Sequence, residues 1–147
     1  MRWKPYQQLR LAQERQVLQR HAPAFQFYEP TGSTYVSGWT TSNLDRSYAL
    51  CIMLPAAFPD VAPNTYISSP SPLLGYRGLR TIDSYGDSHR MHVWRSDQPG
   101  WTKLCVVHPD SWSAEYTIYK VIIKAKLWIS AYESHLDDGR DIDDFLI

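Results

Sequence analysis

A one-sided apolar stripe near the end of the chain constrains its fold more than any other feature. Its residues recur three and four positions apart, as they do along one face of an α-helix. They are Ile118, Val121, Ile122, Ala125, Trp128, Ile129 and Tyr132. Thr117 suits the N-cap of this helix, and Gly139 suits its C-terminal stop. A helix of this kind needs a second apolar layer to cover its stripe.

Four runs with β-strand character precede that helix, and turn residues separate them. The runs span residues 25–28, 34–41, 47–54 and 64–69. Successive strands with short connections predict an antiparallel meander. The third run is almost continuously apolar, which is typical of a central strand covered by a helix.

The remaining segments are expected to surround this sheet. A first helix is predicted from residue 4 to about residue 20, with Pro5 in its first turn. Its apolar residues form a ragged stripe, which favours a surface position, and its arginines favour a solvated face. Residues 70–100 are the least regular part of the chain. Residues 141–147 predict a short acidic turn, packed by Ile142, Phe145 and Leu146.

The composition predicts a single globular domain over residues 1–147, because 44% of its residues are hydrophobic. Fifteen Lys and Arg residues balance 15 Asp and Glu residues, so neither nucleic acid nor a membrane surface is indicated as a partner. No signal peptide is recognisable, and no apolar run reaches the roughly 18 residues of a membrane span. A cytoplasmic location is therefore expected.

The two cysteines stand in unlike contexts. Cys51 lies inside the third β run and is interpreted as core packing, whereas Cys105 ends a short apolar run. Two free thiols are expected in a cytoplasmic protein, and a Cys51–Cys105 disulfide is the alternative. No cofactor is expected, nor a metal site, since these cysteines and His108 lack a second pair of ligands.

Two stretches together resemble one known family. The pattern Pro55-x-x-Phe58-Pro59-x-x-x-Pro63, placed before a strand, is similar to a proline-rich crossing in ubiquitin-conjugating enzymes. Leu104-Cys105, then Trp112-Ser113, then Thr117-Ile118-x-Lys120-Val121-Ile122-Ile123, is similar to the active-site segment and the helix behind it. The order of the elements also matches, and the resemblance covers most of residues 4–132.

The end of the last helix refines the resemblance. Residues 127–139 carry a Trp, a Tyr-Glu pair and a closing Gly, similar to the bacterial branch of this family, whose members occur in antiphage defence operons. The resemblance implies an α+β ubiquitin-conjugating-enzyme-like fold. It would have an N-terminal helix, a four-strand antiparallel meander, an active-site cysteine loop and a long C-terminal helix packed on the sheet.

The resemblance also implies an activity. Cys105 would accept a ubiquitin-like protein, or another protein C-terminus, as a thioester from an activating enzyme. It would then pass that group to an amine on a target protein. The N-terminal helix would dock the activating enzyme, and a cGAS-like nucleotidyltransferase is one candidate target.

The groups that would assist Cys105 are less well defined. His92 matches the His of the family's His-Pro-Asn motif, but the Pro and the Asn are missing here. Backbone amides near Cys105, His92 and His108 are the candidate oxyanion donors. Asp137 and Asp138 are candidates to orient the attacking amine.

Two alternatives remain open at this point. The chain is a non-catalytic scaffold of the same fold that binds a ubiquitin-like protein or a defence partner, or it is a thiol hydrolase that uses Cys105 with His92 or His108. The plainest interpretation makes Cys105 a core cysteine and both histidines surface residues.

Overall fold

The protein is described by a computed structural model over residues 2–146, which is an α+β fold. Its two α-helices are α1 (Pro5–His21) and α2 (Ile118–Asp138). Its described strands form one antiparallel sheet in the order β1-β2-β3-β4-β6-β5. They are β1 (Gln26–Tyr28), β2 (Tyr35–Thr41), β3 (Ser47–Met53), β4 (Asn64–Ser69), β5 (Val93–Trp94) and β6 (Thr102–Leu104).

Both predicted helices and the four-strand meander β1–β4 are confirmed. The expected number of strands is wrong, because the sheet of the described chain has six. The two additional strands, β5 and β6, contain two and three residues. Such short strands cannot display the alternation that identifies a strand in a sequence. The correction matters here because β6 ends next to Cys105.

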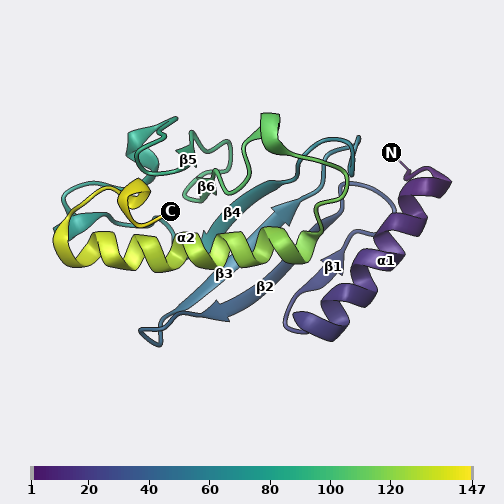
Figure 1. Cartoon of the computed structure of the whole chain (residues 1–147), viewed down its shortest axis with the longest axis horizontal. Helices are drawn as coiled ribbons and strands as arrows, with labels where there is room; N and C mark the ends of the chain where they lie inside the picture. The colour runs from purple at the N-terminus through teal and green to yellow at the C-terminus, as the bar shows by residue number, and fades with distance from the viewer. Residues whose placement is uncertain (1, 147) are drawn as a thin grey trace.

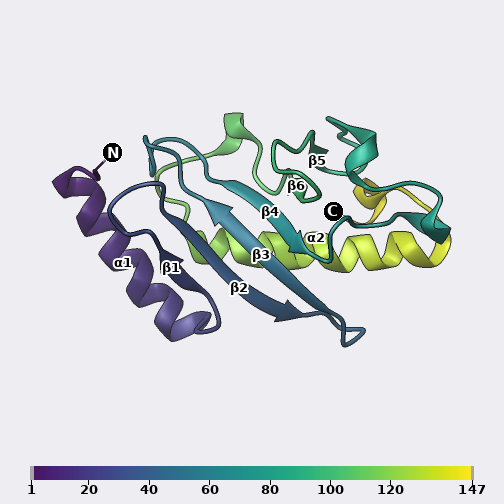
Figure 2. The ribbon, with the colours of Figure 1, turned by 180° about the vertical axis from the view of Figure 1, so that it is seen from behind.

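Helix α2 lies across one face of the sheet, and no α-helix of residues 2–146 covers the opposite face (Figures 1 and 2). All seven residues of its predicted apolar stripe are buried. They share one core with Leu50, Ile52 and Ile67 of the sheet. The hydroxyl of Thr117 accepts the Lys120 N–H at 3.0 Å, and Gly139 adopts a left-handed conformation at the C-cap. The predicted caps of this helix are therefore both confirmed.

Helix α1 lies beside β1 at the edge of the sheet (Figure 1), and much of its buried surface is polar. The buried Gln7 donates to the carbonyls of Ala56 and Phe58 at 2.8 Å each. This contact holds the helix to the proline-rich crossing. The inward-facing polar residues explain why its apolar stripe is ragged.

Three side chains of α2 hold the irregular region after β4. Trp128 donates its indole N–H to the carbonyl of Met91 at 3.0 Å, and the Tyr132 hydroxyl donates to the carbonyl of Leu74 at 2.6 Å. The ring of His135 accepts the N–H of Tyr76 at 3.2 Å. Three short 3-10 helices lie in this region and after Cys105: η1 (Tyr76–Gly78), η2 (Asp83–Tyr85) and η3 (Pro109–Ser111).

The chain then turns back after α2 and forms a fourth 3-10 helix, η4 (Ile142–Phe145). The side chain of Ile142 is fully buried, and Phe145 and Leu146 pack against the core. The predicted packing of this acidic turn is confirmed for these three residues, while Ile147 lies outside the described part of the chain. In Figures 1 and 2, η4 lies beside the segment that leads to β5.

Candidate functional site

Cys105 follows β6 directly, where the chain leaves the sheet. Its backbone N–H donates to the carbonyl of His92 at 2.9 Å, which holds the cysteine against the turn that precedes β5. Its side chain is partly buried, and both cysteines of the chain are free thiols. Burial raises the pKa of the Cys105 thiol above its ordinary value. The thiol is therefore neutral at pH 7 apart from a small thiolate fraction.

Cys51 differs from Cys105 in its surroundings. It lies in β3 directly opposite Tyr66 of β4 and is only 3% exposed. Burial raises its pKa to about 11. Its interpretation as core packing is confirmed, which leaves Cys105 as the more accessible of the two thiols.

The turn before β5 brings the backbone of His92 to Cys105. Ser88 and Val93 exchange two backbone hydrogen bonds at 3.0 and 3.1 Å, and His92 has a positive φ of 50°. A residue with a side chain adopts this conformation at some cost, so the surrounding contacts must hold it. They include the N–H of Cys105 and the neighbouring indole of Trp128, which binds the carbonyl of Met91.

The imidazole of His92 points to the C-terminal segment and not to the thiol of Cys105. Its Nε2 lies 2.6 Å from Oδ1 of Asp143 in η4. This hydrogen bond, aided by the nearby His89, holds the pKa of Asp143 below its ordinary value. Among the described residues, no hydrogen bond joins Sγ of Cys105 to a histidine. The two predicted site residues, Cys105 and His92, are therefore in contact through their backbones and not through their side chains.

A cavity of about 470 Å³ opens beside Cys105. Its walls come from the turn at His92, the outer side of α2 and the C-terminal segment. They include His92, Lys124, Trp128, Ser134, Phe145 and Leu146. The volume falls in the range of ligand pockets. Cys105 thus lines a cavity with one cationic side chain, Lys124, and a largely apolar wall.

The candidate oxyanion donors differ in whether another group already occupies them. The N–H of Cys105 is already bound to His92. In residues 2–146, the N–H groups of Val106 and Val107 have no backbone acceptor. His108 is more than half exposed, and its Nδ1 accepts the N–H of Asp110 at 3.2 Å. The free amides after Cys105 are therefore the donors closest in the chain to the thiol.

An amide side chain that the sequence analysis overlooked lies on the neighbouring strand. Thr65 of β4 pairs with Leu104 of β6, so Asn64 is next to Cys105 in the strand register. Asn64 also lines a cavity of about 340 Å³ together with Val106 and Val107. Asn64 is not among the residues just before Cys105 in the sequence, because strand pairing and not sequence distance brings it close to Cys105.

The other predicted helpers lie apart from the thiol. Neither Asp137 nor Asp138 lines the cavity beside Cys105, and Asp138 is paired with Arg140 at 2.9 Å. The Trp112 indole donates to the carbonyl of Pro59 at 2.8 Å. Trp112 therefore joins the cysteine loop to the proline-rich crossing, as an anchor of that loop would.

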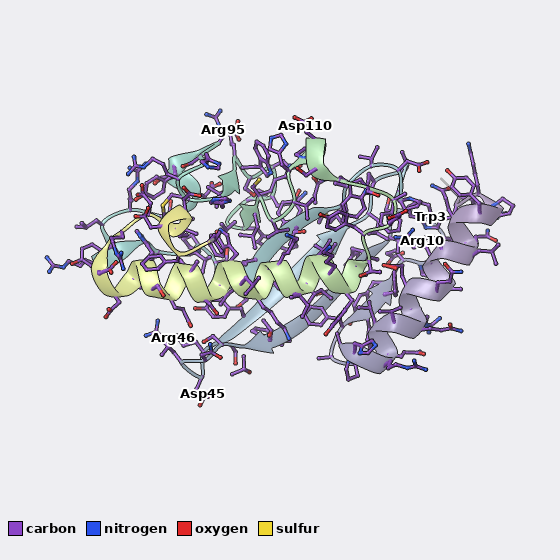
Figure 3. The ribbon with its side chains drawn as sticks, viewed as in Figure 1. Trp3, Arg10, Asp45, Arg46, Arg95 and Asp110 are labelled. Atoms are coloured by element: carbon purple, nitrogen blue, oxygen red, sulfur yellow. The ribbon has the colours of Figure 1, made fainter. Side chains whose placement is uncertain are left out.

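Helix α1 holds the same loop from its other end. Arg10 donates to the carbonyls of Ala114 and Tyr116, and Figure 3 shows it between α1 and the start of α2. The buried carboxylate of Glu14 accepts the N–H of Ile118 in the first turn of α2. Arg10 thus makes an internal contact, although the arginines of this helix were expected to face solvent.

No family model, no curated protein and no solved structure matches this chain. Of the helices in the described residues, none is long and apolar enough to cross a membrane.

Proposed function

We propose that this chain is a ubiquitin-conjugating-like transferase that carries a ubiquitin-like protein, or another protein C-terminus, on Cys105. The observation that carries the proposal is the position of Cys105, whose backbone N–H is bound to His92 at the end of β6 and which lines a cavity beside α2. The resemblance in residues 55–63 and 104–123 supports the same assignment. Antiphage defence is the proposed setting, on resemblance alone.

The proposed first step is a transthiolation. The Cys105 thiolate attacks the carbonyl of a thioester on an activating enzyme; a new carbon–sulfur bond forms, and the enzyme's sulfur leaves as a thiolate. One thioester replaces another, so the step is near energetic balance. A cysteine without a base can perform it through its small thiolate fraction. The raised pKa of Cys105 is compatible with this chemistry, and so is the finding that no histidine of residues 2–146 bonds to its thiol.

In the second step a neutral amine of the target attacks the carbonyl. A carbon–nitrogen bond forms, the carbon–sulfur bond breaks, the Cys105 sulfur leaves as a thiolate, and the nitrogen loses a proton to water. The negative charge that develops on the carbonyl oxygen needs hydrogen-bond donors. We assign this role to the N–H groups of Val106 and Val107, because no other backbone group within the described chain occupies them. Asn64, which precedes the Thr65–Leu104 pair in β4 and lines a cavity with Val106 and Val107, is a third candidate donor.

The proposed partners follow from these steps. They are a ubiquitin-like protein, an activating enzyme and a protein target, for which a cGAS-like nucleotidyltransferase is one candidate. The outer side of α1 is proposed to dock the activating enzyme. Tyr6 and Leu9 are exposed there and Arg15 and Arg20 face solvent, whereas Arg10 is used internally.

A gel without reductant tests the proposal. The purified protein is mixed with ATP, a candidate activating enzyme and a candidate ubiquitin-like protein, both sought first among the products of neighbouring genes. We expect a thiol-sensitive adduct that Cys105→Ala abolishes and Cys105→Lys converts to a thiol-resistant one. Cys51→Ala serves as the matched control and should keep the adduct. If no adduct forms with any candidate partner, the non-catalytic scaffold is favoured.

A second candidate, a thiol hydrolase, gains support from one contact. Asp143 binds His92 at 2.6 Å, and a carboxylate in this position orients the histidine of a cysteine hydrolase. The missing bond between His92 and Cys105 argues against it. Steady release of a ubiquitin-like C-terminus from a fused peptide, lost in His92→Ala, would support the hydrolase over the transferase.

A further inference from the structure

Three side chains that bind metals in other proteins converge beside the turn at His92. The Nε2 atoms of His89 and His92 lie 3.6 and 2.6 Å from the same oxygen, Oδ1 of Asp143. One ligand atom of each residue lies within 4.8 Å of those of the other two. The spacing of the two histidines alone would not reveal this cluster, because Asp143 is 51 residues further along the chain.

The backbone builds this arrangement. The paired Ser88 and Val93 close a four-residue turn, inside which the N–H of His92 donates to the carbonyl of His89 at 3.2 Å. The two imidazole rings lie side by side as a result, with their centroids 4.8 Å apart. The N–H of Asp143 donates to the carbonyl of Arg90 at 2.8 Å. The carboxylate is therefore held against the turn by the main chain as well as by its side chain.

We propose that His89, His92 and Asp143 bind one divalent transition-metal ion, and that zinc is its occupant. Two imidazoles and one carboxylate form a ligand set that suits zinc, with water in the open positions. Calcium and magnesium prefer sites made wholly of oxygen ligands. The sequence predicts no metal site, because its two cysteines and His108 lack a second pair of ligands; only the fold brings His89, His92 and Asp143 together.

The geometry needs one small adjustment to hold the ion. Tetrahedral ligands at zinc distances lie about 3.3–3.5 Å from one another. His92 and Asp143 must therefore separate slightly as the ion replaces the proton between them. His89 must approach, and it is free to rotate because its side chain is 82% exposed. Arg90 does not oppose the ion strongly, since its guanidinium is paired with Asp141 at 2.7 and 2.9 Å.

The metal site adjoins the proposed thioester site, because His92 also lines the cavity beside Cys105. The thiol of Cys105 is not among the clustered ligand atoms, and it is the backbone N–H of Cys105 that bonds to the carbonyl of His92. Zinc binding therefore does not depend on transferase activity. A failure of one proposal leaves the other standing.

Calorimetric titration of the untagged full chain with zinc chloride tests the proposal. We expect one zinc ion per chain with a dissociation constant in the micromolar range. His89→Ala and Asp143→Ala should each weaken binding by about tenfold or more. His108→Ala is the matched control, because His108 and Asp110 form an exposed pair at 3.6 Å to which the described residues add no third ligand. That variant and Cys105→Ser should bind zinc as the parent does.

The proposal is wrong if zinc does not bind at about 100 µM, or if either His89→Ala or Asp143→Ala binds as tightly as the parent. Equal loss in His108→Ala would assign the zinc to surface histidines in general. Loss in Cys105→Ser would assign it to the thiol. Thermal unfolding without zinc should be unchanged in His89→Ala, which separates ligand loss from misfolding.

Discussion

At the scale of single residues, the two cysteines differ mainly in their access to water. Cys51 is enclosed by the sheet, whereas Cys105 opens into a cavity. Burial raises the pKa of both thiols, and for Cys105 no histidine within the described chain provides a hydrogen bond to the thiol that would oppose the shift. In the proposed transferase, Cys105 would be a nucleophile without local activation, which suits exchange between thioesters better than hydrolysis of an amide.

This difference predicts how the two thiols react with iodoacetamide. Modification of Cys105 should accelerate from about pH 7 to about pH 9.5 without levelling off, because its pKa is raised above that of a peptide thiol, about 8.5. Cys51 should stay unmodified over the same range. Peptide mapping of the alkylated wild-type protein measures both rates. A Cys105 rate that is already maximal at pH 7 would indicate a thiolate stabilised by a cation, and hence the hydrolase.

At the scale of elements, α1 controls the loop between Cys105 and α2. Arg10 binds two carbonyls of that loop, and Glu14 accepts the N–H of Ile118 at the start of α2. A carboxylate is also favourable at a helix N-terminus, where the backbone N–H groups lack partners. Burial raises the pKa of Glu14, and the bonds from Ile118 and Arg10 oppose that shift.

Removal of the Glu14 carboxylate should therefore destabilise the fold. Glu14→Ala leaves the buried N–H of Ile118 without an acceptor, and we expect the free energy of unfolding to fall by about 1–3 kcal/mol. Glu14→Gln keeps an acceptor and should lose less. Gln13→Ala, one position away on the solvent side of α1, is the control. Urea denaturation measures all three, and equal effects in Glu14→Ala and Gln13→Ala would contradict this role.

At the scale of the whole molecule, α2 joins the sheet to the long irregular region. Its apolar stripe covers the sheet, while polar atoms of Trp128, Tyr132 and His135 bind backbone groups of that region. Glu133 accepts hydrogen bonds from Ser42 and Tyr48 at 2.7 and 2.8 Å. One helix thus fixes the β2–β3 hairpin, the segment before β5 and, through Met91, the position of His92.

Tyr132→Phe tests this arrangement with a minimal change. It removes only the hydroxyl and leaves the carbonyl of Leu74 without its partner, so the free energy of unfolding should fall by about 1–2 kcal/mol. Tyr119→Phe is the matched control on the same helix, because the Tyr119 hydroxyl makes no side-chain hydrogen bond within residues 2–146. Its effect should stay within about 0.5 kcal/mol. Similar losses in both variants would show that the Leu74 contact does not stabilise the fold.

The parts of the fold that the sequence predicts are those with local signals. The stripe of α2, its caps at Thr117 and Gly139, and the meander β1–β4 depend on residues close in the chain. The parts that it does not predict depend on long-range pairing. β6 is recognisable only through its partner β4, and the His92–Asp143 contact joins residues 51 positions apart. The polar inner side of α1 was missed for the same reason.

The central claim is that Cys105 carries an acyl group as a thioester. The most direct test is mass spectrometry of the protein after reaction with ATP, a candidate activating enzyme and a candidate ubiquitin-like protein. We predict one added modifier, less one water, on the peptide that contains Cys105, and its removal by a thiol reductant. A modifier found on another residue, or one that persists in Cys105→Ala, would contradict the claim.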